Sequence, residues 1–223
     1  MGMRIRAAII AAVAVAATSS LSAPVAGAAA PGETVETTVW QAIADLPRAA
    51  EDRNGYTRAA FRHWVDADRD GCNTRAEVLI EEATTPPRVE GRCTLTGGTW
   101  HSYYDKKDHD QAGALDIDHM VPLAEAWDSG ASQWTPKQRQ DYANDLGDAR
   151  ALVAVTAAEN RAKGDKDPSQ WEPSDDEADC RYLAEWVAVK TRWGLSADTA
   201  EIDALEGLAS ECVDEPLTVE RAR

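Results

Sequence analysis

The sequence has little of several residue types, and each shortage narrows the class of protein. Aromatic residues make up only 6% of its 223 residues and include a single Phe, although eight are Trp. Its 23 Lys and Arg are outnumbered by 39 Asp and Glu, and a net charge of −16 argues against a nucleic-acid partner. Beyond the extreme N-terminus no apolar run reaches the ~18 residues of a membrane-spanning helix. The 43% of hydrophobic residues suffice for one packed core, which excludes full disorder.

The N-terminus has the pattern of a secretory signal over residues 1–30. Arg4 and Arg6 precede the apolar run Ala7–Ala17, and small residues follow it. The run is too short and too rich in Ala for the alternative, a membrane anchor. We therefore expect a secreted, extracellular protein with no membrane partner after signal removal. Its mature part, residues 31–223, should be a single domain and a monomer.

Four cysteines in an exported chain predict two disulfides. Of the three pairings, we favour the local ones, Cys72 with Cys93 and Cys180 with Cys212. A capping box at Ser174–Glu177 predicts a helix that Gly194 ends, and Ser196 opens a second helix. At ~1.5 Å per residue, an antiparallel helical hairpin would bring Cys180 and Cys212 nearly level. A zinc site is disfavoured because there is no C-x-x-C spacing.

The mature chain predicts a small α+β fold with no internal repeat. Its N-terminal third has helical patterns over Thr37–Leu46 and Tyr56–Trp64. Alternation over Leu115–Met120 and the apolar run Ala151–Val155 predict two strands. Capping boxes at Thr135–Gln138 and Thr156–Glu159 start helices. We also expect a short helix over 75–82, short strands and turns over 91–105, and two helices within 123–148.

A cluster of polar residues gathers where the first of these two strands ends. Asp118 and His119 occupy that end, and Asn160 lies one turn into the helix that follows the second strand. If the strands pair, Asn160 is brought over the end of the first strand. Mg²⁺ or Mn²⁺ would accept Asp and Asn oxygens together with water, and a neutral His could take a proton from an attacking water. Neighbours in a strand point to opposite faces, so Asp118 and His119 can serve one site only if the strand bends or ends here. Asp116 shares a face with Asp118 and could be a further ligand or a supporting acid.

These segments resemble the HNH (ββα-metal) endonuclease superfamily. The nearest similarity is to secreted bacterial nucleases related to the C-terminal domain of GmrSD-type restriction enzymes. It rests on Asp116-Ile-Asp118-His119 with Pro122-Leu-Ala-Glu-Ala-Trp127, on Leu152-Val-Ala-Val155, and on Asn160-Arg-Ala-Lys163-Gly-Asp165 with Pro168-Ser-Gln-Trp171, and it extends over roughly residues 56–175.

The resemblance implies roles for individual residues. His119 would be the general base, Asp118 and Asn160 would bind the metal, and Lys163 and Arg161 could contact a phosphate. One departure is Ala151, where many relatives have an Asn that orients the catalytic His. A backbone carbonyl or Asp145 could orient His119 instead. The resemblance implies a ββα-metal core within residues 115–165.

A second motif lies earlier in the chain. The segment 66–77 matches D-x-D-x-D-G-x₅-E, a calcium-binding loop. Its predicted ligand positions are Asp66, Asp68, Asp70, Cys72 through its carbonyl, Thr74 and Glu77. The alternative is an Asp-rich turn that binds no ion.

Two functions follow from these motifs. The first is a secreted, metal-dependent endonuclease that hydrolyses DNA, with RNA as an alternative substrate, with low sequence specificity. The second is an extracellular calcium-binding protein whose HNH-like segment is inactive. The charge of −16 does not exclude the first, because the acids gather elsewhere and residues 149–167 carry one more basic than acidic side chain.

Overall fold

The computed structural model describes residues 1–2 and 30–223 of the chain. The signal sequence predicted over residues 1–30 falls almost entirely on residues 3–29, which lie outside the described residues. Among those described, none of the helices has the length and apolar character needed to cross a lipid bilayer.

The described chain combines short helices with small antiparallel sheets, in agreement with the predicted α+β class. Its helices are α1 (Val39–Asp45), α2 (Thr74–Glu81), α3 (Leu123–Asp128), α4 (Pro136–Tyr142), α5 (Ala157–Lys163), α6 (Asp179–Trp193) and α7 (Thr199–Glu211). Its strands are β1 (Thr34–Thr38), β2 (Arg88–Glu90), β3 (Thr94–Thr96), β4 (Trp100–Ser102), β5 (Lys107–His109), β6 (Leu115–His119), β7 (Leu152–Thr156) and β8 (Pro216–Glu220). Short 3-10 turns lie between them, η1 (Arg58–Ala60), η2 (Ala112–Ala114), η3 (Ala131–Gln133) and η4 (Asp176–Ala178).

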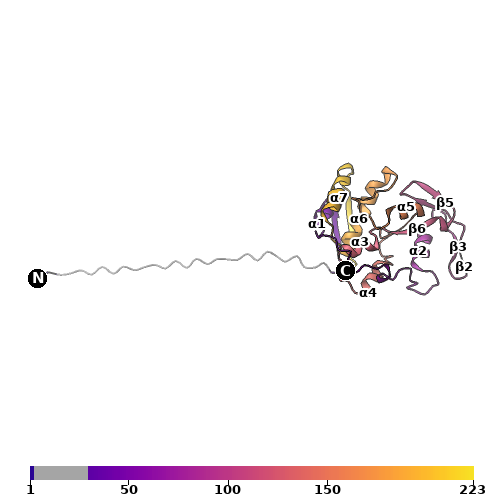
Figure 1. The fold of residues 1–223 in the computed structure, drawn as a ribbon, viewed down its shortest axis with the longest axis horizontal. Coiled ribbons are helices and arrows are strands. Elements are labelled where there is room, and N and C mark those ends of the chain that lie inside the picture. The colour runs from indigo at the N-terminus through magenta and orange to yellow at the C-terminus, as the bar shows by residue number, and fades with distance from the viewer. Residues whose placement is uncertain (3–29) are drawn as a thin grey trace.

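The C-terminal helices form one side of the molecule (Figure 1). There α6 packs against α7, α1 and β8, and Trp186 of α6 is fully buried in the core. The α6 helix ends as predicted at Gly194, whose φ of +62° suits a residue without a Cβ. The second helix begins at Thr199, three residues after the predicted Ser196. Both predicted disulfides are present, and Cys180–Cys212 joins the two helices of this hairpin.

Four two-stranded antiparallel sheets account for the described strands: β1 with β8, β2 with β3, β4 with β5 and β6 with β7. The β1–β8 pair joins segments from opposite ends of the described chain and was not predicted from the sequence. The β6–β7 pair is the predicted one, and it lies with α2, α5 and β5 on the other side of the molecule from α7 (Figure 1). The helices α5 and α2 pack against this pair.

The helical prediction for the N-terminal third is only partly right. The chain is extended over Thr34–Thr38, and the helix begins at Val39 with the Thr38 side chain as its N-cap. Over Tyr56–Trp64 only the single turn η1 is helical, so the longer helix predicted there is wrong. Phe61 is nevertheless fully buried, which shows that its apolar pattern reflects packing and not a helical face.

Two of the predicted capping boxes have different outcomes. At Thr135 both reciprocal hydrogen bonds with Gln138 form. At Thr156 the helix starts where expected, but the side chain does not cap it. Its hydroxyl instead donates to Asp105, at 2.8 Å, and bonds the ring of His109, also at 2.8 Å. Tertiary partners therefore replace the local cap.

Candidate functional site

The strands β6 and β7 and the helix α5 form a compact β-β-α unit. In the hairpin Asp118 lies opposite Val153 and His119 opposite Leu152. The helix α5 follows β7 directly and packs on both strands. As a result, Asp118, His119 and Asn160 line one cavity of about 200 Å³. The structure therefore brings together the three residues that the sequence singled out.

The strand geometry removes the difficulty that Asp118 and His119 are neighbours. Strand β6 ends at His119, and Pro122 follows before α3 begins. Asp116 and Asp118 share the face toward α5, where Asp116 contacts Arg161 and Asp118 contacts Lys163. Asp116 is not among the residues that line the 200 Å³ cavity. This position suits a supporting acid better than a direct ligand.

The imidazole of His119 is buried and oriented by the backbone. Its Nε2 lies 3.0 Å from the carbonyl oxygen of Ala143. A carbonyl can only accept, so Nε2 carries the hydrogen and Nδ1 keeps its lone pair. Of the two groups expected to orient the ring, the backbone carbonyl does so, whereas Asp145 accepts hydrogen bonds from Arg192 and Trp193.

The surroundings of His119 keep it uncharged. Burial lowers its pKa to about 3, and the nearby charge of Arg58 acts in the same direction. The rings of Trp64 and His63 pack close to it, with centroids at 5.4 and 6.4 Å. A neutral imidazole with one free nitrogen can accept a proton.

Asp118 is buried beside a cation of the protein itself. Its Oδ2 accepts hydrogen bonds from Lys163 and from the hydroxyl of Tyr104, the latter at 2.6 Å. Burial raises the pKa of Asp118, and Lys163 opposes that shift. Burial likewise lowers the pKa of Lys163, and Asp118 opposes it. Each charge therefore stabilises the ionised form of the other, which burial alone would disfavour.

Lys163 itself points inward, away from solvent. It is fully buried and also donates to the carbonyl of Met120 at 2.7 Å. The rings of Tyr104, Tyr182 and Trp186 surround its ammonium at 5.6–5.8 Å. The phosphate contact that the resemblance implied for Lys163 does not match this position. The geometry gives it a positioning role toward Asp118 and the end of β6.

The remaining predicted phosphate ligand, Arg161, is exposed at the rim. Its Nε lies 3.3 Å from Asp116, and its side chain is 74% accessible. Two cavity-lining residues were missed by the sequence analysis, Arg58 from η1 and Asp165 just beyond α5. Asp165 stands inside the quoted motif, whereas only the tertiary fold brings Arg58 to the cavity.

The donor set of the cavity suits a hard divalent cation. The hydrogen bonds of Asp118 fall on Oδ2, and its Oδ1 has no hydrogen-bond partner in the described part of the chain. The side chain of Asn160 likewise forms no hydrogen bond with a described residue and lines the same cavity. A carboxylate oxygen and an amide oxygen, completed by water, match the preferences of Mg²⁺ and Mn²⁺.

The Asp-rich loop forms a second acidic region, at some distance along the chain. The carboxylates of Asp66, Asp68 and Asp70 are exposed and come within 4.8 Å of one another. Burial and the charges of these three residues raise the pKa of Glu77. The side chain of Thr74 is not grouped with these carboxylates. Its hydroxyl donates instead to the carbonyl of Val65 at 2.9 Å.

Cys72 also lies in this loop, and its sulfur forms the disulfide with Cys93. Its backbone N–H donates to Asp70 at 2.7 Å, and its carbonyl stays the predicted ligand group. The sharp turn at Gly71 has a φ of +100°, which favours Gly at this position of the motif.

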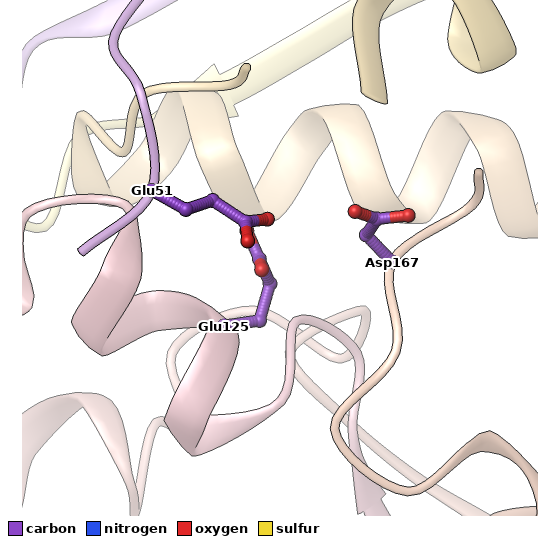
Figure 2. Close-up of side chains that lie close together, drawn as sticks. All are labelled: Glu51, Glu125 and Asp167. Carbon is purple, nitrogen blue, oxygen red and sulfur yellow. The ribbon is translucent and has the colours of Figure 1, made fainter. Parts of the chain in front are cut away.

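A third acidic group was not predicted, because its members are far apart in the sequence. Figure 2 shows the carboxyl groups of Glu51 and Glu125 lying against each other, with Asp167 facing them from a separate segment. Burial and the charge of Glu125 raise the pKa of Glu51 to about 7. Glu125 also accepts a hydrogen bond from the buried Lys190 at 2.9 Å, and Lys190 contacts Glu201 at 2.6 Å. Glu125 thus links this group to a buried polar network between α3, α6 and α7, whereas Glu51 lies exposed at its edge.

Comparison with known proteins identifies the family. Residues 75–207 match the family described as GmrSD restriction endonucleases, C-terminal domain. This range covers more than half of the chain and includes all of β6, β7 and α5. The chain belongs to the GmrSD C-terminal domain family. Arg58 and the three Asp residues of the loop, Asp66, Asp68 and Asp70, lie outside the range that matches the GmrSD family.

A relative of this GmrSD-family chain is known from a fungus. An uncharacterized secreted protein of Arthroderma benhamiae is 42% identical over 166 residues, covering 74% of this chain and 79% of the relative. The relative supports export but gives no support to the bacterial origin expected from the sequence. No solved structure matches this chain.

Proposed function

We propose that this protein is a secreted, metal-dependent endonuclease of the HNH type, acting as a monomer on the phosphodiester bonds of DNA with low sequence specificity. RNA is the alternative substrate. The observation that carries the proposal is that His119, whose ring is oriented by the Ala143 carbonyl so that Nδ1 is unprotonated, lines the same cavity as Asp118 and Asn160. Membership of a restriction endonuclease family supports a nucleic-acid substrate.

Asp118 and Asn160 would hold Mg²⁺ or Mn²⁺ at this cavity. When bound, the ion would polarise the phosphate and stabilise the leaving oxygen. Lys163 favours the ionised form of Asp118 against the effect of burial on its pKa and bonds its Oδ2, so that Oδ1 is the oxygen left for a ligand. Tyr104 fixes the same oxygen from the other side.

His119 would take a proton from the attacking water on Nδ1. As the ring becomes charged, the Ala143 carbonyl that accepts from Nε2 would stabilise it. Burial holds the pKa of His119 at about 3 in the free protein. A phosphate anion beside the ring would raise that pKa toward the range in which a general base is effective.

Plasmid cleavage tests this proposal. Purified protein without its signal segment is incubated with supercoiled plasmid in the presence of Mg²⁺, Mn²⁺ or EDTA, and in parallel with RNA. We expect nicked and linear plasmid with one of the metals and none with EDTA. Plasmid and RNA that stay intact with both metals would refute the enzyme.

The Asp-rich loop favours a second candidate function, calcium binding. Three exposed carboxylates within 4.8 Å of one another repel, and a cation would relieve that repulsion. If the plasmid stays intact but Ca²⁺ raises the melting temperature, the chain is better described as an extracellular calcium-binding protein with an inactive HNH-like segment. Both activities can also coexist, because the loop and the cavity share none of these ligands.

A further inference from the structure

Two basic side chains were predicted to contact a phosphate at the candidate active site, and both are poorly placed to do so. Lys163 is fully buried against Asp118. Arg161 is exposed but contacts Asp116. Arg58, by contrast, lines the cavity with His119 and makes no ion pair with any residue in the described ranges.

Arg58 begins a segment that continues past His119 to a larger cavity. The rings of His63 and Trp64 lie beside the His119 ring. Arg62 and Arg69 then line an open cavity of about 880 Å³. Neither of these two arginines forms an ion pair within residues 30–223. The segment therefore offers an exposed arginine at the small cavity and two at the larger one, and its His63 and Trp64 lie beside the proposed general base.

The backbone of this segment is held by the loop that orients His119. The Asn144 side chain accepts from the Val65 N–H at 3.0 Å and donates to the carbonyl of Arg62 at 2.7 Å. Ala143, its neighbour, supplies the carbonyl that accepts from His119. The backbone at Arg62 and the imidazole of His119 are thus held by the adjacent residues Asn144 and Ala143.

Acidic side chains also line the larger cavity, and most are already occupied. Asp141 pairs with Lys137, and Asp145 pairs with Arg192. Asp66 accepts from a loop N–H and lies at the edge of the Asp-rich loop. The charges of Arg62 and Arg69 therefore remain open to an anion from solution.

We propose that Arg58, Arg62 and Arg69 form a track for the phosphates of the substrate strand, running from the 200 Å³ cavity past His119 into the 880 Å³ cavity. Arg58 binds the phosphate at the cavity, and the other two bind phosphates further along the same strand. This inference rests on the proposed nuclease function and deepens it. Contacts to phosphates carry no base information, so such a track also fits low sequence specificity.

The test compares Arg62→Ala/Arg69→Ala with a control that removes the same charge, Arg88→Ala/Arg92→Ala. The control residues are exposed on the β2–β3 hairpin and line neither cavity. Plasmid cleavage is measured at increasing NaCl. For the track variant we expect KM to rise roughly 5- to 20-fold and the slope of log kcat/KM against log salt to become shallower by about 1–2, while the control matches wild type. Bis(p-nitrophenyl) phosphate, which is too short to extend along the track, should be affected much less.

The variant Arg58→Ala tests the contact with the phosphate at the small cavity separately from the contacts further along the strand. It should reduce cleavage of plasmid and of bis(p-nitrophenyl) phosphate alike, because both must enter the small cavity. Unchanged plasmid KM and salt slope in the Arg62→Ala/Arg69→Ala variant would overturn the track.

Failure of the proposed nuclease function would be visible separately, as wild type that cleaves nothing. In that case, anisotropy of a short fluorescein-labelled DNA strand is measured with His119→Ala protein in EDTA. Weaker binding after Arg62→Ala/Arg69→Ala, but not after the control change, would still support the track. Equal binding by both would refute it.

Discussion

Carboxylates lie in two contrasting surroundings in this protein. In the β-β-α unit Asp118 is buried and is compensated by Lys163. In the Asp-rich loop, Asp66, Asp68 and Asp70 are exposed and close together, and no basic side chain in the described ranges pairs with them. The carboxylate of the first site is therefore balanced by a cation of the chain itself, whereas those of the second would be stabilised by a bound cation. Metal should accordingly govern activity at the first site and folding stability at the second.

The largest expected effect on stability comes from removing the ammonium group of Lys163, which pairs with Asp118. Lys163→Met leaves Asp118 buried and without its partner, which should destabilise the protein by about 3–5 kcal/mol and abolish cleavage. Urea unfolding measures the change. The control Lys166→Met removes an exposed charge nearby and should change stability by less than ~0.5 kcal/mol. Combining Lys163→Met with Asp118→Asn should recover part of the lost stability. A loss of stability in Lys163→Met as small as that of Lys166→Met would contradict the account.

The loop should respond in the opposite way. Asp66→Asn/Asp68→Asn removes repulsion, so the protein without calcium should be slightly more stable than wild type. In wild type, Ca²⁺ at about 100 times its Kd should stabilise by ~2.7 kcal/mol, and the variant should lose this gain. Melting curves with Ca²⁺ and with EDTA give the answer, with Asp203→Asn/Glu211→Gln on α7 as the control. An equal response to Ca²⁺ in wild type and loop variant would exclude this loop as the calcium site.

The smallest effect concerns the third acidic group. The pKa of Glu51 is raised to about 7, so the folded protein holds this proton more tightly than the unfolded chain. Its contribution to stability is complete below pH 4.5 and is lost as the pH rises through about 7. Glu51→Gln should therefore raise the melting temperature more at pH 8 than at pH 5, by a few degrees at most. Glu211→Gln should show no such difference, and a Glu51→Gln shift of equal size at both pH values would argue against the raised pKa.

The contrast between the regions also explains what the sequence could predict. Several features that depend on nearby residues were correct, namely the Gly194 helix end, the Thr135 capping box and both local disulfides, whereas the Thr156 capping box was lost to tertiary partners. The grouping of Asp118, His119 and Asn160 also follows from local order, because a strand pair and a following helix bring them together.

Other features depend on tertiary packing and could not be predicted. In the sequence Lys163 has the pattern of an exposed charge on a helix. Its burial depends on packing against aromatic rings of α6, those of Tyr182 and Trp186. Arg58 reaches the cavity from a segment about 60 residues before His119, with no local signal. The pairing of β1 with β8 joins positions such as Thr34 and Glu220, which are nearly the whole described chain apart.

We propose above all that His119 acts as the general base of a metal-dependent nuclease. It is tested most directly by the rate of plasmid cleavage by His119→Ala, compared with His101→Ala, which changes an exposed histidine bonded to Asp108. We predict that His119→Ala loses about 10²–10⁴-fold in rate with its melting temperature largely retained, while His101→Ala cleaves like wild type. Cleavage by a folded His119→Ala protein at the wild-type rate would contradict the account.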